Sequence, residues 1–249
     1  LIVSDPQFVS SAGLADLVSY HQSRGRTVEV VDVTSLGTDH LAVKAHIQAV
    51  YDRAQPAALE HVLLVGTFDV IPIRPRQDVR PFTRSYTWYG MLDGDDYVPD
   101  VGVGIIPAKN ETELSVVADK TIRYHNRSTP GDWWRRVALV ASTSPVEEFM
   151  TDLEAARTQT YSLGAPVFDT LYGDLGATNS ELSAAFNNGR SVILHHGHGN
   201  TYSWPRWNSL YESFTETQLD ELTNHDMHPV VLSASSLTLQ ILQYCEKIR

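Results

Sequence analysis

Two segments of the chain end in residues whose types could do acyl-transfer chemistry. The apolar segment Ser191–His195 runs into a loop in which glycines flank His198, and the apolar segment Pro229–Ser236 ends in small hydroxyl residues that include Ser235. Glycines beside a histidine let the backbone approach a ligand closely and leave N–H groups pointing outward. An imidazole at one strand end and a small nucleophile at a neighbouring strand end is the arrangement that acyl transfer needs.

Other interpretations of these residues stay open at this point. His195, His196 and His198 lie within four positions and could bind zinc, but strand alternation sends His195 and His196 to opposite faces, which disfavours a shared metal. The Gly-His-Gly segment is also compatible with a plain turn, and a serine after a strand is usually a turn residue. Taken alone, these residues favour the turn.

An acidic segment offers a second candidate site. Asp93, Asp95 and Asp96 lie within Asp93–Asp100 and resemble an oxygen-rich cation loop, but the twelve-residue EF-hand pattern is lacking. A solvated acidic turn is favoured, and a structural calcium ion is kept as the alternative. No other cofactor is expected.

The elements that would position these residues alternate along the chain. Short apolar runs rich in β-branched residues are typical of strands buried in a parallel sheet, and segments with helical periodicity separate them. The expected strands are 1–4, 27–32, 61–65, 101–106, 137–141, 167–171, 191–195 and 230–233, and the expected helices are 13–24, 39–53, 111–126, 146–163, 179–187 and 216–222. This alternation predicts an α/β fold with a mostly parallel sheet and helices on both faces.

A change of composition divides the chain. Residues 73–100 are rich in Pro, Arg, Tyr and Asp and are expected to form a long loop, and residues 127–135 are a plausible hinge. We therefore expect an N-terminal α/β subdomain at 1–128 and a C-terminal catalytic subdomain at 129–249, with the second one incomplete at its C-terminal end.

Composition narrows the function classes. The chain has 249 residues and a formal net charge of −11, so nucleic acid is not expected as a partner, because phosphate binding needs a basic face. The longest apolar runs are too short for a membrane span. A single cysteine, Cys245, excludes a disulfide framework within the chain.

Several segments, in this order and spacing, resemble a known family. The quoted pieces are Val62-Leu-Leu-Val-Gly66 with Asp69-Val-Ile-Pro72, Leu92–Gly104, and Phe186–Gly199 with Trp204 downstream. They are similar to peptidase family C25, the gingipain family of cysteine proteases, within the clan that also holds the caspases. The resemblance runs from residue 1 to about residue 236. It implies a caspase-like three-layer sandwich with two subdomains.

The resemblance also implies roles for individual residues. His198 would be the catalytic histidine, and position 235 would be the nucleophile, which is normally cysteine. The backbone N–H groups of Gly199 and residue 235 would form the oxyanion hole. The thiolate would attack the scissile carbonyl and the histidine would protonate the departing amine. Trp204 and Glu148 are candidate substrate-binding residues, and Asp152 is a further acidic candidate for a basic-residue pocket.

Two departures from the family pattern bear on activity. Ser235 stands where cysteine is expected, and a serine hydroxyl is a much weaker nucleophile than a thiolate unless a base is hydrogen-bonded to it. The tail 239–249 does not resemble the family, and Cys245, which lies in it, is not expected to be the nucleophile. The serine is compatible with an engineered substitution, a naturally inactive relative or an incomplete piece of a longer enzyme.

The leading hypothesis is therefore a cysteine endopeptidase domain that acts on proteins or peptides and is inactive with serine at the nucleophile position. The alternative is a non-catalytic domain that keeps the fold and binds a peptide or partner, and a third option is a serine hydrolase with His198 as base. By resemblance, the protein would be part of a longer secreted polypeptide, located outside the cell or at its surface.

Overall fold

The structure is a computed structural model that describes residues 1–37, 39–53, 59–74, 85–144, 148–160 and 166–236. The chain forms two compact units: unit 1 contains Leu1–Ile122, and unit 2 begins at Arg123. The division lies within helix α4 (Glu111–Asn126).

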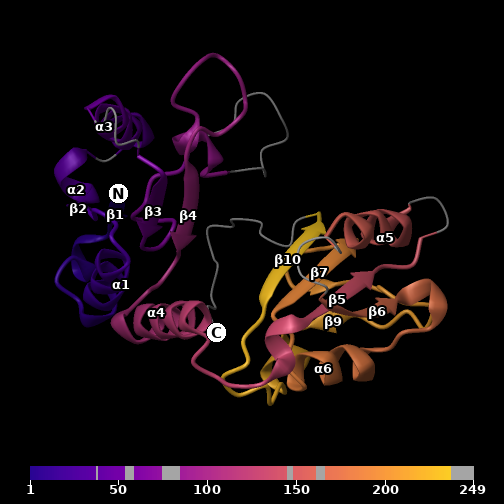
Figure 1. The fold of residues 1–249 in the computed structure, drawn as a ribbon. Coiled ribbons are helices and arrows are strands. Elements are labelled where there is room, and N and C mark those ends of the chain that lie inside the picture. The colour runs from indigo at the N-terminus through magenta and orange to yellow at the C-terminus, as the bar shows by residue number, and fades with distance from the viewer. Residues whose placement is uncertain (38, 54–58, 75–84, 145–147, 161–165, 237–249) are drawn as a thin grey trace. The chain divides into compact units, whose positions relative to one another are not determined.

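Unit 1 is built on a parallel four-stranded sheet in the order β2-β1-β3-β4 (Figure 1). The strands are β1 (Ile2–Ser4), β2 (Val30–Asp32), β3 (His61–Val65) and β4 (Gly102–Ile106). The helices are α1 (Ala12–Ser23), α2 (Val33–Leu36), α3 (His40–Arg53) and α4, with short 3-10 helices at Pro6–Phe8 and Thr87–Gly90.

Helices cover both faces of this sheet, because alternate strand residues point to opposite sides. On one face, Leu14 and Leu17 of α1 and Leu114 of α4 pack with Ile2 and Val65. On the other face, α3 packs against Val3 and Leu64 together with the buried rings of Tyr86 and Tyr89. Unit 1 is thus a three-layer α/β structure.

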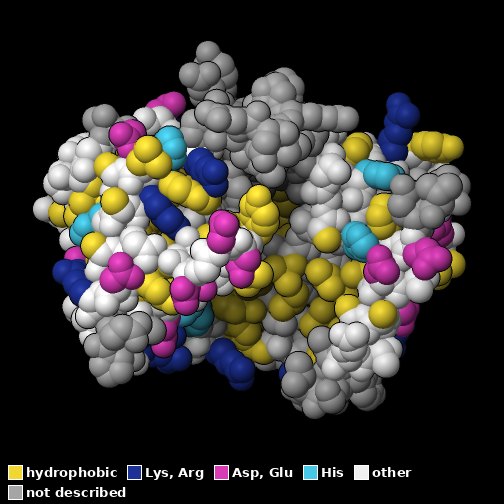
Figure 2. Space-filling model, turned by 90° about the horizontal axis from the view of Figure 1, so that it is seen from above, with side chains coloured by type: hydrophobic (Ala, Val, Ile, Leu, Met, Phe, Trp, Pro, Cys, Tyr) yellow, Lys and Arg dark blue, Asp and Glu magenta, His cyan; other side chains and the backbone are white. Residues whose placement is uncertain are grey.

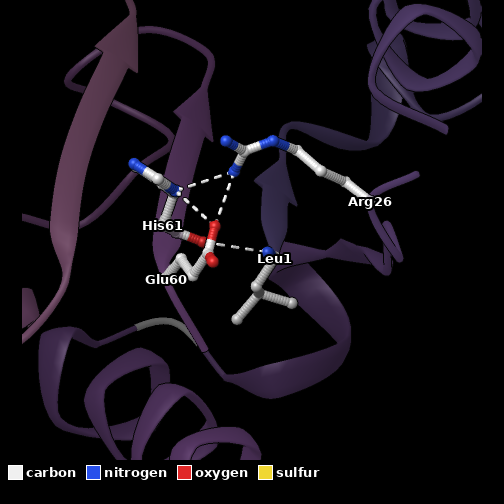
Figure 3. A network of polar contacts seen from close by, with 4 residues as sticks. All are labelled: Leu1, Arg26, Glu60 and His61. Atoms are coloured by element: carbon white, nitrogen blue, oxygen red, sulfur yellow. Dashed lines mark hydrogen bonds and ion pairs between the residues drawn. The ribbon is translucent and has the colours of Figure 1, made fainter. Parts of the chain in front are cut away.

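A polar cluster lies where β3 begins (Figure 3). Arg26 donates to the Glu60 carboxylate at 2.8 Å, its guanidinium lies 3.2 Å from Nδ1 of His61, and the amino group of Leu1 donates to the carbonyl oxygen of His61 at 3.0 Å. The side chains of Arg26, Glu60 and His61 are largely exposed. The cluster ties the starts of β1 and β3 together at the edge away from the strands' carboxyl ends.

Unit 2 contains a second parallel four-stranded sheet, in the order β10-β7-β5-β6 (Figure 1). Its strands are β5 (Arg136–Ala141), β6 (Val167–Tyr172), β7 (Val192–Gly197) and β10 (Val230–Ser235). The helices are α5 (Phe149–Thr160), α6 (Asn179–Asn187) and α7 (Glu216–Asp220), with 3-10 turns at Asp132–Arg135 and Gly173–Leu175. A small antiparallel pair joins β8 (Ser203–Trp204) and β9 (Phe214–Thr215).

The two faces of this second sheet carry different helices (Figure 1). Helix α6 packs Leu182 and Phe186 on Ala138, Val140 and Ile193, and the β8–β9 loop region adds Trp204 and Trp207 to the same cluster. Helix α5 packs Phe149 and Leu153 on Leu139 and Ala141 of the opposite face. Odd and even positions of β7 therefore face different helices. Because His195 and His196 are neighbours in β7, their side chains lie in different environments.

Both sheets share one topology. Counted within its unit, the first strand lies between the second and the third, and the fourth lies outside the third. In open parallel sheets with this order, ligands bind outside the carboxyl ends of the strands where the strand order reverses. In unit 2 that point is between β5 and β7, directly beside the end of β10.

The parallel α/β prediction is confirmed, with two differences in detail. The expected loop 73–100 includes the buried aromatic turn Thr87–Gly90, because Tyr86 and Tyr89 donate to carbonyl oxygens of Ile71 and Pro72 and fill the core. Strand β10 was expected to be buried on both faces, but the side chains of Val230, Val231 and Leu232 are 40%, 43% and 52% exposed, because β10 is the edge strand.

The surface carries mixed charges. Figure 2 shows acidic and basic side chains interspersed on the face that it draws. Among the described helices, none is both long and apolar enough to cross a membrane.

Candidate functional site at the ends of strands β7 and β10

Strands β7 and β10 bring the two predicted segments side by side. They are parallel neighbours in which Ser233 pairs with His195, Ala234 with His196 and Ser235 with Gly197. His198 is exposed and follows directly after β7. Because neighbouring parallel strands lie about 4.8 Å apart, the carboxyl ends of β7 and β10 lie close together.

His195 is the buried histidine of this region. Its Nδ1 lies 3.1 Å from Oγ of Ser233 and its Nε2 lies 3.3 Å from Oγ of Ser142, while its ring stacks on Trp204 with centroids 3.9 Å apart. Burial, followed by the nearby His196 and His198, lowers the pKa of His195 to about 3. The imidazole is therefore neutral near pH 7, and its role is to hold neighbouring groups in place.

The same polar network reaches the end of β10. Oγ of Ser233 also accepts the indole N–H of Trp204 at 3.1 Å and lies 2.7 Å from Oγ of Ser235. Ser233, Ser235 and His195 consequently share the face of the sheet that Trp204 covers.

His196 and His198 lie near α5 on the opposite face. The ring of Phe149, the first residue of α5, lies 4.8 Å from the ring of His196 and 5.3 Å from that of His198, centroid to centroid. Nδ1 of His196 lies 3.3 Å from a carboxylate oxygen of Asp152, one turn along the helix. Asp152, a candidate for an acidic pocket, is therefore already engaged with His196. The predicted separation of His195 from His196 is found.

The end of β5 packs tightly under this site. The N–H of Ser142 donates to the carbonyl oxygen of His196 at 3.0 Å, and the N–H of Thr143 donates to that of Trp207 at 2.8 Å. A Cβ on Gly197 would overlap the side chain of Ser142. Glycine at 197 is thus required so that Ser142 can reach His195 beneath the strand end.

A tight turn follows the exposed histidine. Oδ1 of Asn200 accepts the N–H of Tyr202 at 2.8 Å, and the N–H of Asn200 donates to the carbonyl oxygen of Ser203 at 3.0 Å. The turn fixes the chain directly after His198 and Gly199. Gly199, the predicted oxyanion residue, lies between the imidazole and this turn, and its role stays a prediction.

The two predicted substrate-binding residues lie in different environments. Trp204 is 8% exposed, packed on His195 in the core. Glu148 is exposed and lies directly before α5, one residue from Phe149. Of the two, only Glu148 is exposed to a ligand from solvent. Both substrate-binding assignments stay predictions.

The acidic segment uses its carboxylates on its own backbone. Asp100 accepts the N–H groups of Leu92 and Asp93 at 2.6 and 2.8 Å, and Asp96 accepts that of Val98 at 2.8 Å. In the described part of the chain, no group of three or more His, Cys, Asp or Glu side chains is arranged to hold a metal ion. The calcium site at Asp93, Asp95 and Asp96 stays a prediction, and Cys245 lies outside the described residues.

Sequence reasoning missed several residues that shape the site. Phe149, Ser142, Ser233 and Asn200 hold the histidines or the adjoining backbone, yet each is an ordinary residue type in its segment. Only one signal was available: Ser142 follows a predicted strand whose carboxyl end belongs to the same sheet edge as His198.

Comparisons with known proteins indicate the family to which the chain belongs. A profile of the family described as "Peptidase family C25" matches residues 1–241. Gingipain R2 of Porphyromonas gingivalis is 25% identical over 237 residues, which cover 89% of this chain and 30% of that protein. Gingipain R1 of the same organism is also 25% identical over 237 residues, 89% of this chain and 22% of that protein. The chain thus spans less than a third of the length of these relatives.

Solved structures match the fold. "Crystal structure of the Arg specific cysteine proteinase gingipain R (RGPB)" has a TM-score of 0.80 and 23% identity, covering 94% of this chain and 53% of that one. A second, described as "Structure of Protease", has a TM-score of 0.81 and 22% identity, covering 96% and 52%. These matches confirm the predicted caspase-like α/β fold. Because the family profile covers nearly the whole chain, this protein is a member of peptidase family C25.

Proposed function

We propose that unit 2 is the peptide-hydrolysing domain of a cysteine endopeptidase, with His198 as general acid and the nucleophile at the end of β10. The observation that supports this proposal is the parallel pairing of β7 with β10: the exposed His198 follows β7, and β10 ends in small hydroxyl residues at the sheet edge where ligands bind in such folds. Membership in family C25 supports the same reaction.

The chemistry follows from that arrangement when the nucleophile is a thiolate. Its sulfur electron pair forms a bond to the scissile carbonyl carbon, and the C=O electron pair moves onto oxygen, where backbone N–H groups, including that of Gly199, stabilise the charge. The C–N bond then breaks, the amine leaves with the proton of the His198 imidazolium, and a thioester remains. Water attacks the thioester, and the acid product and the thiol are released.

Serine at this strand end makes the chain as given a poor catalyst. The end of β10 carries Ser235 and Ser236, and a serine hydroxyl needs a base in direct hydrogen bond to become nucleophilic. The hydroxyl of Ser235 is hydrogen-bonded to that of Ser233, which is not a base. We therefore propose that this sequence is inactive until a cysteine replaces the serine.

The test is a restored-thiol assay. Ser235→Cys and Ser236→Cys are made separately in a Cys245→Ser background and offered a peptide library that includes Arg and Lys sites. At least one variant is expected to cleave peptide bonds. Adding His198→Ala should lower its kcat/KM by about 100-fold or more, as loss of general acid catalysis does. The proposal fails if neither variant cleaves, or if cleavage does not depend on His198.

Glu148 is the acidic residue proposed to select basic substrates. It is exposed directly before α5, whereas Asp152 is paired with His196. In an active cysteine variant, Glu148→Gln should raise KM for Arg and Lys substrates more than for uncharged ones. An equal effect on both classes would remove Glu148 from this role.

A non-catalytic binding domain is the second candidate, favoured by the serines at the end of β10. It predicts that the cysteine variants stay inert while the unmodified chain binds peptides with heat measurable by calorimetry. A third candidate, a serine hydrolase, predicts that a fluorophosphonate labels Ser235 in the unmodified chain. Absence of that label by mass spectrometry would remove it.

We further propose that the protein acts outside the cell or at its surface, as part of a longer polypeptide that cleaves protein substrates. The support is its family and its match to less than a third of the length of two gingipains. Fractionation of the native organism with an antibody against unit 2 tests the location. Detection only in the cytosolic fraction would contradict it.

A further inference from the structure

We propose that Ser236, rather than Ser235, occupies the nucleophile position that faces His198. This inference rests on the proposed function, because it names the residue that would carry out the attack. It depends on which face of the sheet each side chain takes at the ends of β7 and β10.

The side chains along this strand pair can be assigned to faces from their contacts. Residues paired across neighbouring parallel strands point to the same face, and successive residues point to opposite faces. Ser233 pairs with His195, and their side chains touch at 3.1 Å on the face that Trp204 covers. Ser235 lies on that face too, since its Oγ is 2.7 Å from Oγ of Ser233.

The other face carries the exposed histidine. Ala234 pairs with His196, whose ring lies beside Phe149 of α5, and the ring of His198 lies beside the same phenylalanine. The side chains of His198 and Ser235 therefore point to opposite faces. An attack by residue 235 would require its side chain to leave Ser233 and turn around the strand end.

A nucleophile must point to the same face as His198 and must be exposed to a bound peptide. Residue 236 meets both requirements, and residue 235 does not. Ser236 and His198 each follow directly after the last pair of the register, Ser235 with Gly197, so one further step of that register would set them opposite each other. Alternation turns its side chain to the face of Ala234 and His196, where His198 lies. Ser236 is exposed, as a group that attacks a bound peptide must be, whereas Ser235 is half-buried.

The arrangement also gives Ser235 and Ser233 a different role. Their hydroxyls link the end of β10 to the buried, neutral His195, so they hold the strand end in place while residue 236 projects over it. The backbone N–H of residue 236, rather than that of residue 235, would then accompany Gly199 in stabilising the oxyanion.

Thiol reactivity distinguishes the two positions without any need for peptidase activity. Ser235→Cys and Ser236→Cys, each in a Cys245→Ser background, are alkylated with iodoacetamide from pH 4 to 10, where the thiolate displaces iodide. An imidazolium next to a cysteine lowers the pKa of its thiol from about 8.5 to about 3.5–7.5. We expect the midpoint for Cys at 236 to lie below about 7.5 and to return toward about 8.5 when His198→Ala is added.

Ser235→Cys is the matched control, one residue away on the other face. Its midpoint should stay at about 8.5 or above and should not respond to His198→Ala, because its neighbour His195 is neutral. A His198-dependent midpoint at 235, or no such dependence at 236, would overturn the inference. Circular dichroism of all four proteins verifies that the fold is kept. Failure of the proposed function would show separately, as absence of peptide cleavage by either cysteine variant.

Discussion

At the scale of single residues, three histidines within four positions have three environments. His195 is buried under Trp204, His196 is half-buried beside Asp152, and His198 is exposed after the strand. Alternation along β7 separates the first two, and the end of the strand frees the third. One residue type therefore has both structural and proposed catalytic roles within four positions.

His195 should make stability depend on pH. Its pKa is lowered to about 3 by burial, whereas an unfolded histidine titrates near 6.5. Between these values the unfolded state binds the proton and the native state does not, so unfolding free energy falls as pH drops from about 6.5 to 3. One such proton gives at most about 1.4 kcal/mol per pH unit. Urea unfolding of His195→Gln should show a shallower acid slope, and identical slopes would contradict this.

Gly197 should tolerate no side chain. Since an added Cβ would overlap Ser142, Gly197→Ala is expected to cost about 1–3 kcal/mol of unfolding free energy, as overpacking does. The matched control is Gly104→Ala in β4, where the nearest atom would be Cδ1 of Leu63 at 3.7 Å, an ordinary contact. Adding Ser142→Gly should recover part of the loss. If the two alanine variants unfold at the same urea concentration, the predicted overlap between a Cβ at position 197 and Ser142 is wrong.

At the scale of elements, helix α6 begins with a complete capping box. The Thr178 hydroxyl accepts the N–H of Glu181, and the Glu181 carboxylate accepts the N–H of Thr178 at 2.8 Å. Thr178→Ala is expected to lower unfolding free energy by about 1 kcal/mol, and Thr178→Ser by much less, because serine caps equally well. Thermal melts of both variants measure the difference. Equal losses would show that the hydroxyl is not the stabilising group.

Sequence patterns predicted these elements better than they predicted the site. Strand β3 and helices α4 and α6 lie at their predicted bounds because apolar periodicity and capping residues act locally. The contact of Phe149 with His198 joins residues 49 positions apart in the chain, and nothing local marks it. Strand β7 extends to Gly197, two residues beyond its predicted end, which moves His196 into the strand and leaves His198 directly after it.

At the scale of the whole molecule, the parallel α/β fold was predictable and the side-chain faces at the strand ends were not. Resemblance gave His198 and position 235, but the side-chain face of each strand end depends on register, and a shift of one residue exchanges the faces. The hydrogen bonds that join Ser233 with Ser235 and with His195 supply that information. The contact of Ser233 with His195 joins two strands that are 38 positions apart in the chain, and no single segment encodes their pairing.

The net charge of −11 leads to a prediction for the whole chain. Neutralising nucleic-acid phosphates requires Lys and Arg, and the chain has 19 of these against 30 Asp and Glu. Duplex DNA at 150 mM salt should therefore bind more weakly than about 10⁻⁴ M in fluorescence anisotropy. Micromolar binding that weakens steeply with salt would reveal a basic surface and contradict this expectation.

The central claim is that the end of β10 and His198 act together on a peptide carbonyl. Its most direct test is covalent capture: a protein with Ser235→Cys, Ser236→Cys and Cys245→Ser is treated with a peptidyl acyloxymethyl ketone, and the modified residue is mapped by mass spectrometry. The account predicts one adduct, on Cys at position 236, that disappears when His198 is replaced by alanine. Absence of any adduct on the cysteine-substituted protein, or labelling that persists without His198, would contradict the account.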